Sequence, residues 1–121
     1  MSDTDPIYVA ARGAELVRLP LAARERISFD RRELREIFDV YGRKVVSGEW
    51  RDYAVDFLND RAVFSVFRRT SEMPLYRIVK DPSLTRRQGA YAVITATGLV
   101  LKRGHELRNV LRVLEKPRLV N

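Results

Sequence analysis

The chain of 121 residues has the length of one ordinary domain, and its 45% apolar content is enough to bury a core without disulfides or metal ions. It contains no cysteine, which excludes thiol nucleophiles, thiolate metal ligands and disulfide bonds. The net charge is +7, and residues 61–121 hold thirteen basic and four acidic residues, so the excess positive charge belongs to the second half of the chain.

The sequence shows no membrane-spanning or export segment. No apolar stretch approaches the roughly 18–20 residues that cross a bilayer. The acidic start MSDTDP lacks the basic region and the long apolar core of a signal peptide. We therefore expect a cytoplasmic protein that does not contact a membrane.

Arginine dominates the basic residues. It accounts for 19 of the 23, and its guanidinium group suits forked contacts with phosphate or carboxylate better than an ammonium group does. A genome biased toward arginine codons gives the same ratio without any function, so the composition leaves both interpretations open.

Residues 1–26 mix small apolar residues with arginine, a glycine and a proline, and they show no sustained hydrophobic period. We expect them to form a flexible or partly docked N-terminal segment. The remaining residues, 27–121, are expected to form a single domain.

The clearest element is a helix over residues 28–48. Asp30 is placed to cap it, and Glu33 follows at the spacing of a capping box. Gly48 is a suitable left-handed stop. The apolar side chains recur as one helical stripe: Leu34, Ile37, Phe38, Tyr41 and Val45.

From residue 51 to 103 the apolar period changes from 3.6 to 2, which is typical of strands. The predicted strands are RDYAVDFL (51–58), RAVFSVFRR (61–69), LYRIVK (75–80), AYAVITA (90–96) and LVLKR (99–103). Their connections are too short for parallel crossovers, so the sheet should be antiparallel.

Helical spacing returns in HELRNVLRVLEK at 105–116, which Pro117 closes. The order of elements is therefore helix, strands, helix. We predict an α+β fold, in which an antiparallel sheet of about five short strands carries an N-terminal and a C-terminal helix packed on it.

Four stretches together resemble a family of small bacterial proteins that is catalogued only as a domain of unknown function. They are WRDYAVDFLNDRAVFSVFRR, PLYRI, QGAY and ATGLVLKRGHEL, and the resemblance runs from about Phe29 to Glu115. It implies a stand-alone bacterial domain. It implies no reaction, ligand or partner, so no functional residue is transferred.

The sequence contains no recognisable set of catalytic residues. A single histidine and no cysteine give no recognisable nucleophile and base, and both the phosphate-binding loop and the dinucleotide fingerprint are missing. We predict no catalytic residue, no metal site and no cofactor. A small enzyme that uses Asp52, Asp56 or His105 remains the least favoured alternative.

Basic residues gather at the end of the second strand, in the loop before the fourth strand, and around the start of the last helix. We predict that they form a basic patch for nucleic acid or another polyanion: Arg68, Arg69, Arg86, Arg87, Lys102, Arg103, His105, Arg108 and Arg112. The competing interpretation is an ordinary charged helix face. In that interpretation Glu106 satisfies the helix dipole, and His105 is an ordinary residue of a first turn.

Six aromatic residues lie on the predicted strands: Tyr53, Phe57, Phe64, Phe67, Tyr76 and Tyr91. They either stack bases on an open sheet face or fill the core under the helices. The alternative function is a protein-interaction or self-associating module, with a protein partner or a homodimer. It rests on RAVFSVF and AYAVITA as candidate edge strands, because edges recruit partners.

Overall fold

The computed structural model describes residues 26–69 and 73–115. The predicted N-terminal segment lies outside the described residues, apart from Arg26. The elements are α2 (Arg31–Val46), β1 (Asp52–Phe57), β2 (Ala62–Phe67), β3 (Tyr76–Lys80), the short 3-10 helix η1 (Pro82–Leu84), β4 (Tyr91–Thr95), β5 (Val100–Gly104) and α3 (Leu107–Glu115). They confirm the predicted α+β fold.

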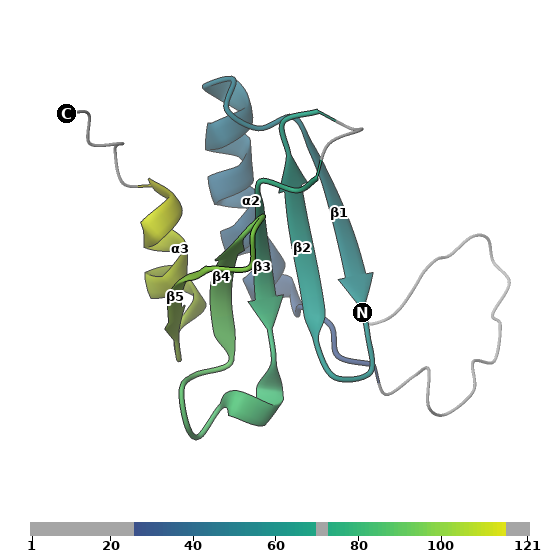
Figure 1. The fold of residues 1–121 in the computed structure, drawn as a ribbon, viewed down its shortest axis with the longest axis vertical. Coiled ribbons are helices and arrows are strands. Elements are labelled where there is room, and N and C mark those ends of the chain that lie inside the picture. The colour runs from purple at the N-terminus through teal and green to yellow at the C-terminus, as the bar shows by residue number, and fades with distance from the viewer. Residues whose placement is uncertain (1–25, 70–72, 116–121) are drawn as a thin grey trace, which may run out of the picture.

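The five strands form one antiparallel sheet in the order β1-β2-β3-β4-β5, so each strand pairs with its neighbour in the sequence. Both helices lie on the same side of the sheet, behind it in the view of Figure 1. The edge strands are β1 and β5. The interpretation of RAVFSVF and AYAVITA as edge strands is therefore wrong, because these runs form β2 and β4, which have a neighbour on each side.

The predicted helix cap is present at the start of α2. Asp30 Oδ1 accepts a hydrogen bond from the Glu33 backbone N–H at 2.8 Å, and Glu33 Oε1 accepts one from the Asp30 backbone N–H at 2.8 Å. These two bonds make the capping box. At the other end Gly48 has a φ of 83°, the left-handed conformation expected of the stop.

The core-facing line of α2 differs from the predicted stripe. Its buried side chains are Glu33, Ile37 and Val40, at positions i, i+4 and i+7. Phe38 and Val45 are exposed, because they lie on a different side of the helix from this buried line. A buried carboxylate, Glu33, therefore takes a place that apolar periodicity alone does not predict.

The core lies between the helices and the sheet. Its buried side chains come from both helices, from the sheet and from the residues that flank α2, and they include Phe29, Ile37, Trp50, Phe64, Ile78, Val93, Leu107, Val110 and Leu111. The helix α3 packs on the sheet because its four buried side chains lie on one stripe of the helix: Leu107, Val110, Leu111 and Leu114.

The strand aromatics lie mostly under the helices. Phe57, Tyr76 and Tyr91 pack against the core, and Tyr53 stacks on Phe64 with 5.1 Å between the ring centroids.

Phe67 differs from the other strand aromatics, because it follows the buried Val66 in β2 and so points to the opposite face of the sheet. We call this opposite side the open face, since no helix among the described residues covers it. An aromatic platform for stacked bases is therefore absent from the described open face, and that interpretation is wrong.

Gly89 lies where the chain enters β4 and passes close to the end of β5. Its φ is 103°, and a Cβ atom on Gly89 would lie 2.2 Å from the backbone C and O atoms of Gly104. Only glycine satisfies both the conformation and the close approach.

We expect Gly89→Ala to destabilise the protein much more than Gly98→Ala. Gly98 has a φ of 95° but open space around its Cβ position, so alanine there costs roughly 1–2 kcal/mol for conformation alone. At Gly89 the clash with backbone adds about 1–3 kcal/mol. Urea unfolding of both variants measures the difference, and equal losses would contradict the close approach.

Candidate functional site

One end of the sheet carries a hollow of about 490 Å³, which we call the arginine hollow. Its lining residues are Val45, Gly48, Trp50, Arg51, Arg68 and Arg69. Among these described residues three carry a guanidinium group and none carries a carboxylate. The hollow therefore gathers positive charge around a concave surface.

Backbone pairing brings two of these arginines together. Asp52 pairs with Phe67 across β1 and β2, and the Arg51 backbone N–H donates to the Phe67 carbonyl oxygen at 2.7 Å. Arg51 therefore lies next to the end of β2. The side chains of Arg51 and Arg68 both line the hollow, beside Val45 and Gly48 at the end of α2.

Two aromatic neighbours fix the position of Arg51. Trp50 is only 4% exposed, and its ring lies 6.1 Å from that of Tyr41. The Tyr41 hydroxyl donates to the Arg51 carbonyl oxygen at 2.9 Å. Burial, together with the nearby Asp52 and Tyr53, raises the pKa of Tyr41, so the phenol keeps its proton and this hydrogen bond further into the alkaline range.

A second hollow, of about 570 Å³, lies between α2 and the start of α3, and we call it the interhelical groove. It is lined by Arg32, Arg35, Glu36, Asp39, Tyr91, His105, Glu106, Leu107 and Arg108. Three guanidinium groups thus face three carboxylates. Glu36 Oε2 lies 3.3 Å from Arg32 and 3.7 Å from Arg108, so this groove offers an anion no excess of positive charge.

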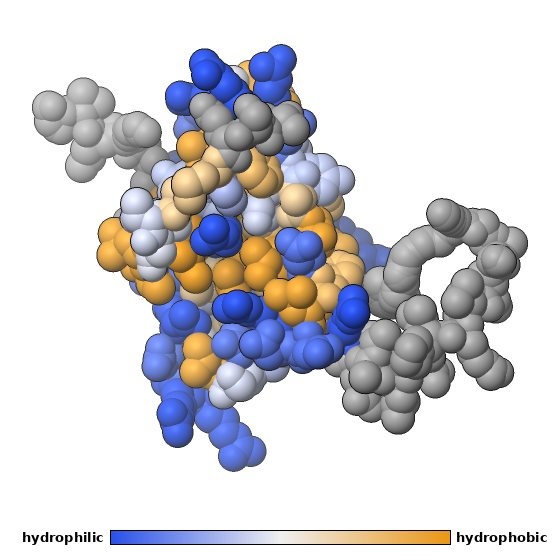
Figure 2. Space-filling view, turned by 45° about the vertical axis from the view of Figure 1, so that its right-hand side comes forward, coloured by the Kyte–Doolittle hydropathy of each residue, from blue (hydrophilic) through white to orange (hydrophobic). Residues whose placement is uncertain are grey.

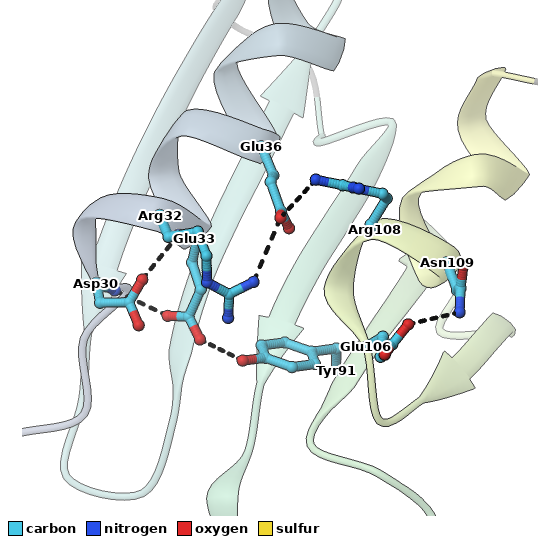
Figure 3. A network of polar contacts seen from close by, with 8 residues as sticks. All are labelled: Asp30, Arg32, Glu33, Glu36, Tyr91, Glu106, Arg108 and Asn109. Carbon is cyan, nitrogen blue, oxygen red and sulfur yellow. Dashed lines mark hydrogen bonds and ion pairs between the residues drawn. The ribbon is translucent and has the colours of Figure 1, made fainter.

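His105 is exposed and lines the interhelical groove. The neighbouring Glu106 accepts a hydrogen bond from Asn109 Nδ2 at 2.9 Å (Figure 3). A carboxylate therefore already occupies the start of α3, where the helix dipole favours negative charge. This arrangement suits the interpretation of His105 as an ordinary residue of a first turn.

A buried carboxylate network ties α2 to the sheet. Glu33 is 2% exposed, and its Oε1 accepts a hydrogen bond from Lys80 Nζ at 2.8 Å. Lys80 Nζ also donates to the Ser28 carbonyl oxygen at 2.9 Å. The Tyr91 hydroxyl donates to Glu33 Oε2 (Figure 3). Every polar group of this network has a partner, which is the condition for burying charge at tolerable cost.

The structure separates the nine predicted site residues. Arg68 and Arg69 line the arginine hollow, whereas His105 and Arg108 line the interhelical groove. The two pairs therefore belong to different sites.

The other predicted residues line neither hollow. Arg86 and Arg87 are exposed in the loop that follows η1, and Arg112 is exposed on α3. Lys102 and Arg103 are neighbours in β5, so their side chains leave opposite faces of the sheet. Arg103 therefore belongs to the open face.

Two features of these sites are not predicted from the sequence. Arg51 joins Arg68 and Arg69 because its backbone N–H bonds to the Phe67 carbonyl oxygen across the β1–β2 hairpin, a contact that no local sequence pattern predicts. The contact of Glu33 with Lys80 joins residues 47 positions apart, so no local sequence pattern predicts it.

The described residues contain no group of three or more histidine, cysteine, aspartate or glutamate side chains placed to hold a metal ion. In the same part of the chain, no helix combines the length and the apolar character that crossing a bilayer requires.

A family model described as "Protein of unknown function (DUF2794)" matches residues 27–111. This match confirms the resemblance that the sequence motifs indicate. Searches of curated proteins and of solved structures gave no match.

We expect Lys80→Met to lower the free energy of unfolding by about 3 kcal/mol, because it leaves the buried Glu33 carboxylate without its cation. The matched control is Lys44→Met, which removes the cation 3.3 Å from Glu49 in an ion pair whose carboxylate is half exposed. Such pairs contribute about 0–1 kcal/mol. Chemical denaturation measures the loss of unfolding free energy in both variants. Similar losses would show that the buried ion pair stabilises the fold no more than the half-exposed pair does.

We also expect Tyr91 to make the fold sensitive to alkali. Burial, and then the hydrogen bond to Glu33, raise the pKa of Tyr91 in the folded protein. Its contribution to stability is therefore complete below the unfolded pKa of about 10 and falls as the pH rises above it.

Tyr91→Phe should remove this part of the pH dependence. Thermal unfolding between about pH 8 and pH 11 should show a stability difference between wild type and variant that narrows or reverses above about pH 10. A difference that stays constant over this range would contradict the assignment.

Proposed function

The chain belongs to the DUF2794 family, whose description assigns no function, and from the site alone we propose that it is a non-catalytic binding module for an anionic partner. Nucleic acid is the partner that we place first among polyanions. The observation that carries the proposal is the arginine hollow, where Arg51, Arg68 and Arg69 surround one concavity.

Guanidinium groups suit this role because each presents several N–H donors in a planar fork that matches phosphate oxygens. The arginine hollow draws them from two chain segments, the start of β1 and the end of β2, which the sheet holds in a fixed register. Arg51 and Arg68 are both exposed, so a phosphate group can reach them from solvent.

The proposed contacts are to the phosphate backbone and not to the bases. The strand aromatics that could stack on bases mostly lie under the helices. Phosphate contacts carry no sequence information, so we expect binding that depends little on sequence and strongly on salt. Arg86 and Arg87, exposed in their loop, are proposed as further contacts along an extended partner.

The non-catalytic part of the proposal rests on the carboxylates. Asp52 and Asp56, the candidates for acid–base work, line neither the arginine hollow nor the interhelical groove. His105 does line the groove, but two of the three carboxylates there, Glu36 and Glu106, take part in ion pairs or hydrogen bonds with other residues.

We expect the Arg51→Ala, Arg68→Ala double variant to lose at least tenfold in affinity for a 20-base-pair DNA duplex or a single-stranded RNA of similar length, and to retain its melting temperature. Fluorescence anisotropy at about 50 mM and about 200 mM salt measures both the affinity and its salt slope. Removing two phosphate contacts should lower that slope by about 2.

The matched control is the Arg108→Ala, Arg112→Ala double variant, which removes the same charge from α3. We expect it to change affinity less than threefold, because Arg108 faces the charge-balanced groove. Equal losses in both double variants would mean that net charge and not the arginine hollow drives binding. Absence of binding by the wild type at low salt would refute the proposal outright.

A further inference from the structure

The open face carries one row of side chains whose ends have opposite charge. Strand pairing aligns Asp56, Val63, Val79, Ala92 and Arg103 across the five strands from β1 to β5. Paired residues of neighbouring strands point to the same face, so all five side chains lie on the open face. The row is acidic at one edge, apolar in the middle and basic at the other edge.

The middle of the open face is apolar and well packed. Val63, Phe67 and Ile94 are partly exposed on this face, whereas Val79 and Ala92 are buried. Figure 2 shows apolar residues gathered over the middle of the visible surface, with hydrophilic residues among them and around them. Exposed apolar side chains on a side of the sheet that no described helix covers are the kind of surface that binds another protein.

The two charges at the ends of the row have no partner in the described chain. Asp56 is exposed and makes no ion pair with a described residue. Arg103 Nη1 is buried, yet no described residue accepts a hydrogen bond from it. The residue as a whole is partly exposed, so a carboxylate of another molecule can approach its guanidinium group from solvent.

Asp56 and Arg103 cannot meet within one molecule. They lie on the two edge strands, and four inter-strand spacings of about 4.8 Å put them roughly 19 Å apart. Their pairing requires a second molecule that presents its own edges in reverse order.

We propose that the open face is a self-association surface, on which two copies of the chain pack sheet against sheet about a two-fold axis parallel to the strands. Such an axis lays β1 of one copy over β5 of the other. Asp56 then meets Arg103 of the second copy twice, and Val79 lies near the axis. Two-fold interfaces require a surface that is complementary to itself in this way. The inference is independent of the arginine hollow, which lies beside the end of α2.

The size of the face indicates a weak dimer. Five strands of about five residues span roughly 19 by 17 Å, or about 320 Å² on each copy, which is below the area of a standard specific interface and allows only weak association. Arg77 weakens it further: this residue lies on β3, between Ser65 and Ile94, so its two copies come close at the axis. Like charges there oppose the contact.

The test reverses the charges at Asp56 and Arg103 and measures the dissociation constant of the dimer. Analytical ultracentrifugation from about 10 µM to about 1 mM protein covers the range in which weak dimers dissociate. We expect the wild type to dimerise with rising concentration. Asp56→Arg alone and Arg103→Glu alone should each raise the dissociation constant at least tenfold. An equimolar mixture of the two variants should form a heterodimer at least as tight as the wild-type dimer, because both edge pairs are then opposite in charge.

Controls separate this surface from others. Asp60→Arg makes the same charge change in the β1–β2 turn, off the open face, and should leave the dissociation constant within about twofold. Asp56 is exposed, so Asp56→Arg is expected to fold even where Arg103→Glu does not. Arg77→Leu should tighten the dimer by removing the repulsion at the axis.

Three results would overturn the inference. The first is a wild type that stays monomeric at every concentration, and the second is a dimer that Asp56→Arg leaves intact. The third is a dimer that Arg77→Leu weakens, which would show that Arg77 attracts an acidic surface and does not face its own copy.

Discussion

Glu33 takes part in two structures at once, and the position of α2 depends on it. Through its backbone N–H and one carboxylate oxygen it completes the cap with Asp30, and through the same carboxylate it accepts hydrogen bonds from Lys80 on β3 and Tyr91 on β4. The start of the helix is therefore fixed both along its axis and against the sheet. Hydrophobic packing alone gives neither constraint, because it is non-directional.

With α2 fixed in this way, the two sides of the sheet take different roles. Most of the large aromatic and aliphatic side chains fill the space under the helices, while Phe67, Val79 and Ala92 lie on the other side. Charged side chains follow the same division. Arg51 and Arg68 line the hollow beside the end of α2, whereas Asp56 and Arg103 belong to the open face. One sheet thus presents two chemically distinct surfaces, and a ligand on one leaves the other accessible.

The elements of the fold could be predicted from the sequence because each rests on local physics. Apolar periodicity locates the five strands and both helices, and Asp30 and Gly48 mark the two ends of α2 through capping and left-handed conformation. The candidate site could be predicted only in part. Arg68 and Arg69 are visible as a pair in the sequence, but their grouping with Arg51 depends on hairpin register. The balance of charge around Arg108 depends on how two distant helices pack.

The order of the elements has a consequence for how the protein is made. The strands form a meander of contacts between sequence neighbours, which can pair as soon as they leave the ribosome. The core under them cannot close at that stage, since α3 supplies Leu107, Val110, Leu111 and Leu114 and is the last described element to be synthesised. Until then the newly made sheet and α2 expose apolar surface, which is the condition under which nascent chains aggregate or recruit chaperones.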